Sequence, residues 1–179
     1  MHFSESKTYR NLRAAYEGEL RAAGKYALYA ETAREQGLAG VAAIFDEAAR
    51  NEREHAKRWL DRLNGGEPLA TLDNLRDSAH GEFAAWSELY RRFAQEADDE
   101  GFHELSRLFE RVADVERRHN KQFCGLADRL SSGRQYCRDE DMAWLCLWCG
   151  HMHAGRCAPQ ECPLCGRSRA SFAPIYELE

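Results

Sequence analysis

The sequence predicts an all-α four-helix bundle followed by a small C-terminal metal domain built on four cysteines. Apolar residues recur at helical spacing over most of the chain, glutamates and histidines lie inside these apolar stripes, and two Cys-x-x-Cys pairs stand near the C-terminus. With 179 residues, the chain is long enough for one substantial core and a small additional domain, but not for two full-sized domains.

Four stretches have apolar residues at a period near 3.6, which predicts four helices over residues 6–36, 41–63, 75–98 and 101–130. Gly37 ends the first, and Gly65, Gly66 and Pro68 end the second. The segment GGEPLATLDN is expected to form a crossover to the third helix. We therefore expect a bundle over 1–132, a linker over 133–143 and a cysteine domain over 144–179.

Two of the helices each contain a Glu-x-x-His motif, and the other two each place one glutamate in the apolar stripe. These residues are Glu19, Glu52, His55, Glu82, Glu116 and His119. Positions i and i+3 share a helix face, so each motif can bind one ion from a single helix. Unpaired buried carboxylates are costly, and a charge of about −4 balances two divalent cations. The set therefore predicts a dinuclear site, as in ferritin-like di-iron bundles.

The alternative for these motifs is an exposed helix surface, which is the usual position of a single Glu-x-x-His motif. Here both motifs are in phase with apolar stripes, and Glu19 and Glu82 stand in the stripes of two other helices. This agreement favours metal binding.

The C-terminal segment contains Cys146-x-x-Cys149 and Cys162-x-x-Cys165, each followed by glycine. Four thiolates at this spacing form a tetrahedral site that suits iron or zinc. Beside a dinuclear bundle, an electron-carrying iron is the more natural occupant, and a zinc ribbon is the alternative. The remaining cysteines have no second thiol at ligand spacing, and we expect unligated thiols at Cys124, Cys137 and Cys157.

The net charge of −5 and the pI near 5.8 argue against nucleic acid as a partner. The first twenty residues lack the apolar run of a signal peptide, and no run is long enough to span a bilayer. We expect a soluble cytoplasmic protein with no membrane partner, and cysteine usage typical of a reducing compartment.

Over almost its whole length the chain resembles the rubrerythrins, which join a ferritin-like di-iron domain to a rubredoxin-like domain. The resemblance rests on NLRAAYEGELRAAGKYALYA, NEREHAKRWL and VERRHNKQF in the helices, and on Trp144, both cysteine pairs, Pro159 and SFAPIY in the tail. It implies that Glu52 and Glu116 bridge two irons. It further implies that Glu19 and His119 complete the coordination of one iron, and that Glu82 and His55 complete that of the other. Tyr26 and Tyr90 are then expected close to the ligands.

The resemblance also implies an activity: a homodimer that reduces hydrogen peroxide to water in defence against oxidative stress. Electrons are then expected from a rubredoxin or an NAD(P)H-dependent reductase, through an iron bound by the four cysteines. Three alternatives remain, namely a ferroxidase or iron-handling protein, an oxygen-dependent oxidase, and a sensor without turnover.

Ala85 departs from the family pattern, which has a second glutamate three residues after the ligand of the third helix. In the family this carboxylate exchanges with the histidine of the second helix when the site is reduced. Its absence implies that His55 stays bound in both redox states, as in the more symmetric site of bacterioferritin, and it gives weight to the oxidase and ferroxidase alternatives.

Overall fold

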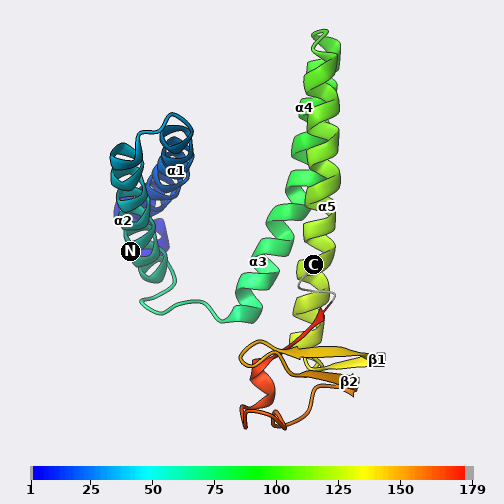
Figure 1. Cartoon of the computed structure of the whole chain (residues 1–179). Helices are drawn as coiled ribbons and strands as arrows, with labels where there is room; N and C mark the ends of the chain where they lie inside the picture. The colour runs from blue at the N-terminus through cyan, green and yellow to red at the C-terminus, as the bar shows by residue number, and fades with distance from the viewer. Residues whose placement is uncertain (1, 176–179) are drawn as a thin grey trace. The chain divides into compact units, whose positions relative to one another are not determined.

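The structure is a computed structural model that describes residues 2–175, with helices over most of the chain and a small β-sheet near its C-terminus (Figure 1). The chain divides into two compact units between Ala70 and Thr71. Among the described residues, no helix combines the length and apolar character that a bilayer span requires.

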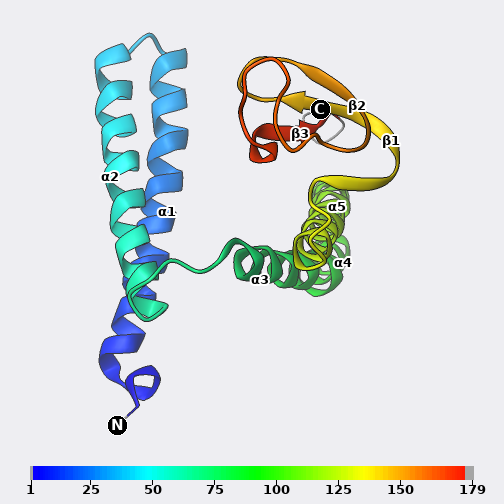
Figure 2. The same cartoon turned by 90° about the horizontal axis from the view of Figure 1, so that it is seen from below.

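The first unit is a helical hairpin of α1 (Lys7–Glu35) and α2 (Ala39–Leu63), preceded by the short 3-10 helix η1 (Phe3–Glu5); the hairpin is clearest in Figure 2. Ser6 caps α1, because its hydroxyl oxygen accepts a hydrogen bond from the N–H of Tyr9 at 3.0 Å. Gly37 has a φ of 75°, and this left-handed residue lets the N–H of Leu38 bond back to the carbonyl of Ala33. The predicted end of the first helix at Gly37 is confirmed.

The second unit begins with a longer helical hairpin, in which α4 lies alongside α5 (Figure 1). Its elements are α3 (Thr71–Ala84), the π-helical segment η2 (Ala85–Leu89), α4 (Tyr90–Asp99) and α5 (His103–Ser131). Helix α3 begins inside the segment expected to be crossover, and Asp73 in its first turn favours the helix N-terminus. The π-helical segment η2 was not expected from the sequence, whose apolar pattern predicted one continuous helix over 75–98.

The two hairpins are repeats of one pattern, and η2 marks the difference between them. The segment GELRAAGKY of α1 corresponds to GEFAAWSELY, which ends at the first residue of α4. Glu19 and Tyr26 are seven residues apart, whereas Glu82 and Tyr90 are eight apart. A π-turn holds one residue more than an α-turn. The additional residue is therefore accommodated in η2, so that Glu82 and Tyr90 can keep the same relative positions on the helix as Glu19 and Tyr26.

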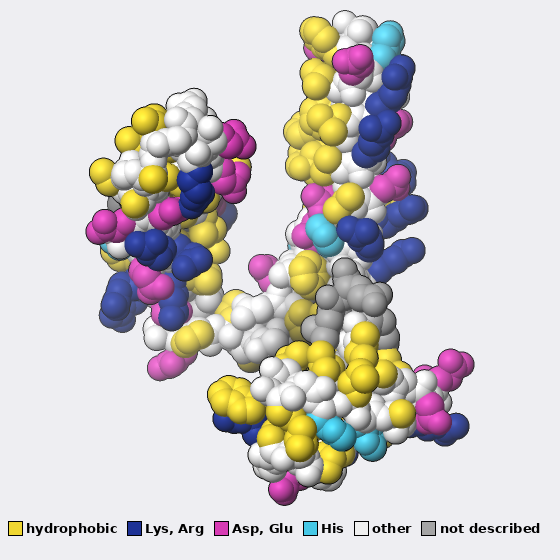
Figure 3. Space-filling view, viewed as in Figure 1, with side chains coloured by type: hydrophobic (Ala, Val, Ile, Leu, Met, Phe, Trp, Pro, Cys, Tyr) yellow, Lys and Arg dark blue, Asp and Glu magenta, His cyan; other side chains and the backbone are white. Residues whose placement is uncertain are grey.

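Each hairpin buries mainly small side chains where its helices meet. The buried residues are Ala30, Ala33, Ala42 and Ala56 in the first, and Ala79, Ala94, Ala97, Ser106 and Ala127 in the second. Larger apolar side chains remain exposed, such as Ile44 at 68% and Phe102 at 56%. Figure 3 shows apolar side chains along one side of the α4–α5 hairpin and Lys and Arg along the other. Neither hairpin buries its own apolar stripe.

The second unit ends in a three-stranded antiparallel sheet of order β2-β1-β3, with β1 over Cys137–Cys146, β2 over Met152–Cys157 and β3 over Phe172–Pro174. The 3-10 helix η3 (Arg169–Ser171) precedes β3. Trp144 is fully buried, and its indole N–H donates to the carbonyl of Gly155 at 2.9 Å. Strand β1 starts inside the stretch 133–143 that was expected to be linker, because its first residue pairs with the end of β2.

Candidate metal centres

The first hairpin brings Glu19, Glu52 and His55 together, and their ligand atoms lie within 4.8 Å of one another. Glu52 and His55 are one turn apart on α2, and the Oε2 atom of Glu52 lies 2.8 Å from Nδ1 of His55. Glu19 reaches the same histidine from α1, with Oε1 at 4.0 Å from Nδ1. These three residues, which we call the first triad, offer two carboxylates and one imidazole to an ion.

The second hairpin repeats this arrangement with Glu82 of α3 and with Glu116 and His119 of α5. The Nδ1 atom of His119 lies 2.8 Å from Oε2 of Glu116 and 3.8 Å from Oε1 of Glu82. Close by, the side-chain amide of Asn120 donates to the carbonyl of Ala79 at 2.7 Å and ties α5 to α3. We call this group the second triad.

The charges of the second triad favour a cation. Burial raises the pKa of Glu82, the nearby carboxylate of Glu116 raises it further, and His119 opposes the rise only in part. Two carboxylates held this close repel each other when both are ionised. A divalent cation removes the repulsion and takes up both carboxylates and the imidazole as ligands, so the residues fit the metal that the sequence predicted.

The grouping of side chains within each hairpin differs from the pairing that the resemblance implied, and the assignment of ligands to individual irons stays a prediction. The resemblance assigned Glu19 to one iron with His119, and Glu82 to the other with His55. The structure instead gathers Glu19 with His55 and Glu82 with His119, because helices adjacent in the chain pair within each hairpin. Each of the six predicted ligand residues thus lies in either the first or the second triad.

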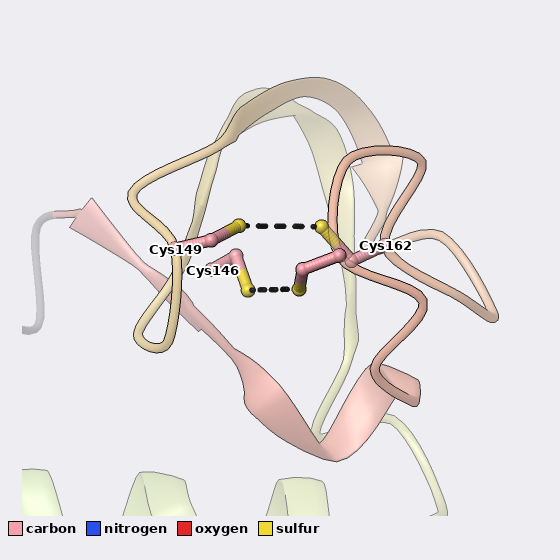
Figure 4. Close-up of side chains that lie close together, drawn as sticks. Cys146, Cys149 and Cys162 are labelled. Atoms are coloured by element: carbon pink, nitrogen blue, oxygen red, sulfur yellow. Dashed lines mark hydrogen bonds between the residues drawn. The ribbon is translucent and has the colours of Figure 1, made fainter.

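The tail brings Cys146, Cys149, Cys162 and Cys165 into one cluster (Figure 4). Sulfur distances are 3.8 Å from Cys146 to Cys165 and 3.6 Å from Cys149 to Cys162. Gly150 and Gly166, which follow the two pairs, have φ values of 76° and 71°. Their N–H groups donate to the carbonyls of Cys146 and Cys162, both at 2.9 Å, so the two knuckles share one turn geometry.

The cysteines of this cluster differ in acidity. Burial disfavours the thiolate of Cys146, but the backbone N–H groups of Cys149 and Trp148 donate to its sulfur and bring its pKa down to about 7. The backbone N–H of His151 donates to the sulfur of Cys149 and lowers its pKa, but burial and the surrounding thiols outweigh this effect and raise the pKa of Cys149 to about 12. The thiols cannot all ionise side by side without a cation, and a bound metal replaces their protons.

Cys137 and Cys157 are not the unligated thiols that the sequence analysis expected. They stand opposite each other on β1 and β2 and form a disulfide. The spacing rules for metal ligands do not detect such a pair, because it depends on the register of two strands. Cys124 is a free, exposed thiol on α5, as expected.

Tyr26 and Tyr90 occupy equivalent places in the two hairpins. The Tyr26 ring lies 6.2 Å from that of Phe45, and the Tyr90 ring lies 6.2 Å from that of Phe109. The contacts recorded for both rings are aromatic, so their place near the ligands stays a prediction from the resemblance.

Comparison with known proteins now decides the family. The family described as rubrerythrin matches residues 10–127 and, in a second match, 73–143, and the rubrerythrin rubredoxin-like domain matches 144–173. The chain belongs to the rubrerythrin family. Three relatives are each 36% identical to it: the rubrerythrin of Porphyromonas gingivalis over 95% of this chain and 90% of its own, rubrerythrin-1 of Clostridium acetobutylicum over 96% of both, and the rubrerythrin of Nitratidesulfovibrio vulgaris over 93% of both.

Family membership confirms the predicted fold class, a ferritin-like helical bundle with a rubredoxin-like tail. The two triads and the four-cysteine cluster are consistent with the metal complement of this family, a di-iron site and a rubredoxin-type iron.

Proposed function

We propose that this member of the rubrerythrin family reduces hydrogen peroxide to water, with two irons held by the triads and electrons supplied through an iron bound by the four cysteines. The observation that supports this proposal best is the presence of both kinds of site in one chain. The triads provide the carboxylates and imidazoles of a redox-active di-iron site, and an all-sulfur site suits one-electron transfer.

The reaction consumes one peroxide, two electrons and two protons and gives two water molecules. When bound, the two irons supply the redox chemistry and together exchange two electrons with peroxide. The four glutamates balance the charge of the metals, and His55 and His119 add ligands without adding charge. Tyr26 and Tyr90 have phenol groups that can donate protons to oxygen, and we assign them this role on the basis of the resemblance.

The source of electrons and the assembly are part of the proposal. A tail iron carries one electron at a time, so each turnover needs two deliveries from a rubredoxin or an NAD(P)H-dependent reductase. We further propose a homodimer, which agrees with the apolar side chains that the hairpins leave exposed, and no membrane or nucleic-acid partner.

Ala85 favours a second candidate, an oxidase or ferroxidase that uses dioxygen. This residue is the first of η2, three positions after Glu82, and its methyl group cannot bind a metal. A site with two glutamates and one histidine per triad resembles the symmetric sites of iron-oxidising bundles. The four-cysteine tail argues against a purely iron-storing role, because storage needs no electron relay.

Comparing peroxide with dioxygen as oxidant distinguishes the two candidates. The iron-loaded protein is reduced anaerobically and mixed, in separate experiments, with peroxide or with dioxygen at equal concentration, and reoxidation is followed optically. We expect faster reoxidation by peroxide. Faster reoxidation by dioxygen would reject the peroxidase in favour of the oxidase, and the same preference with sustained iron oxidation would identify a ferroxidase.

A further inference from the structure

The Cys137–Cys157 disulfide lies where the chain passes from α5 into the sheet. Cys137 is the first residue of β1, and Cys157 is the last of β2. The register between the two strands is irregular from Cys137 to Met142, so the strands pair regularly only from Met142 onward. At the open end, the disulfide lies beside a hydrogen bond from the N–H of Ala158 to the carbonyl of Tyr136 at 2.9 Å, and both link the ends of the two strands.

This disulfide closes a loop that contains the first cysteine knuckle. Cys146 and Cys149 both lie between the two bonded cysteines, whose sequence separation is 20. Ala158, which follows Cys157 directly, is buried in the same small core as Cys146 and Cys162. Opening the bond therefore frees the base of a hairpin that positions half of the metal ligands.

The surroundings of Cys137 combine solvent access with a nearby guanidinium group. Both cysteines are only half-buried, so small oxidants have access to them. The guanidinium group of Arg138 lies next to Cys137 and donates to its carbonyl oxygen at 2.8 Å. The thiolate is the form of a cysteine that oxidants attack.

We propose that Cys137 and Cys157 form a reversible thiol pair that hydrogen peroxide oxidises, and that their disulfide holds the four-cysteine domain closed around its metal. The Cys137 thiolate attacks peroxide, so that an S–O bond forms, the O–O bond breaks and the first water leaves after protonation. The Cys157 thiol then attacks this sulfenic sulfur, so that the S–S bond forms and the second water leaves. The two sulfurs lose two electrons in total. A dithiol reductant returns these electrons and restores both thiols.

Peptide mapping tests the oxidation step, independently of peroxide turnover at the di-iron site. The full-length, metal-loaded protein is reduced with a dithiol, desalted, treated with peroxide in excess of what the di-iron site can consume in one turnover, alkylated and digested with trypsin. We expect residues 135–138 linked to residues 157–167. In Cys124→Ser the link should still form, whereas in Cys137→Ser it should be absent. Alkylated Cys137 and Cys157 after peroxide treatment of the wild type would overturn the proposal.

Metal retention tests the closure step. We expect the visible absorption of the tail iron to disappear roughly tenfold faster in a chelator after the disulfide is reduced. Cys137→Ser should lose iron at this fast rate with or without the dithiol, which separates the disulfide from any direct effect of the reductant on iron. Equal rates for the oxidised and reduced wild type would show that the bond does not hold the domain closed.

Discussion

The surroundings of Glu82 disfavour its ionised form. Its pKa is raised above the ordinary value of 4.5 by burial and then by the carboxylate of Glu116. In metal-free protein, Glu82 therefore stabilises the fold while it is protonated, and this contribution is lost as the pH rises through its pKa in the folded protein. A bound cation reverses this preference for the protonated form, because the ionised carboxylate of Glu82 then serves as a ligand.

Glu82→Gln should stabilise the metal-free protein at neutral pH but not well below pH 4.5, where Glu82 is protonated in both the folded and the unfolded state. We expect its melting temperature at neutral pH to exceed that of the wild type by about 2 °C. Glu88→Gln, which removes an exposed carboxylate of η2, is the control and should show no such pH-dependent gain. A gain that is equal at both pH values would contradict the charge repulsion assigned to this site.

Ala85→Glu should supply a carboxylate one turn from Glu82. If a competing carboxylate selects for peroxide, the ratio of peroxide to dioxygen turnover should increase several-fold. Ser87→Glu adds the same charge at another residue of η2 and should leave the ratio unchanged. An unchanged ratio in Ala85→Glu would show that this position does not determine the choice of oxidant.

At the scale of elements, η2 accounts for the one-residue difference between the hairpins. Deleting Ala85 leaves Glu82 and Tyr90 seven residues apart, as Glu19 and Tyr26 are in the regular helix α1. We expect this deletion to convert η2 into α-helix and to preserve metal binding at the second triad. Metal content and helical circular dichroism measure both effects.

Deleting Ala22 is the matched control, because α1 has no additional residue to lose. This deletion rotates Glu19 by about 100° relative to the residues that follow it, and it should abolish metal binding at the first triad. Equal loss of metal in both deletions would mean that η2 does not simply absorb an additional residue.

The elements also show what the sequence could and could not predict. The Glu-x-x-His motifs and the Gly37 turn follow from local spacing, so the candidate ligand residues and the end of the first helix were predictable. The π-turn at η2 becomes visible only when the two hairpins are compared. The Cys137–Cys157 bond and the grouping of Glu19 with His55 depend on contacts between elements, which helix and ligand spacing do not specify.

At the scale of the whole molecule, the account requires two kinds of metal site with separate tasks. In the proposed function, irons held by the triads react with peroxide, and an iron held by the four-cysteine cluster supplies electrons for repeated turnover; the two kinds of site are built from separate residues. Because the two kinds of site use different ligands on different elements, a variant can disable the four-cysteine site and leave the triads intact.

Cys162→Ser provides the most direct measurement of this division. In chemically reduced protein, the variant should still consume one equivalent of peroxide per di-iron site in a single turnover, at a rate close to that of the wild type. With an electron-donor protein, its steady-state rate should fall at least roughly 100-fold. A variant that keeps the wild-type steady-state rate would contradict the electron-relay role of the four-cysteine site, and loss of the single turnover would contradict the separation of tasks.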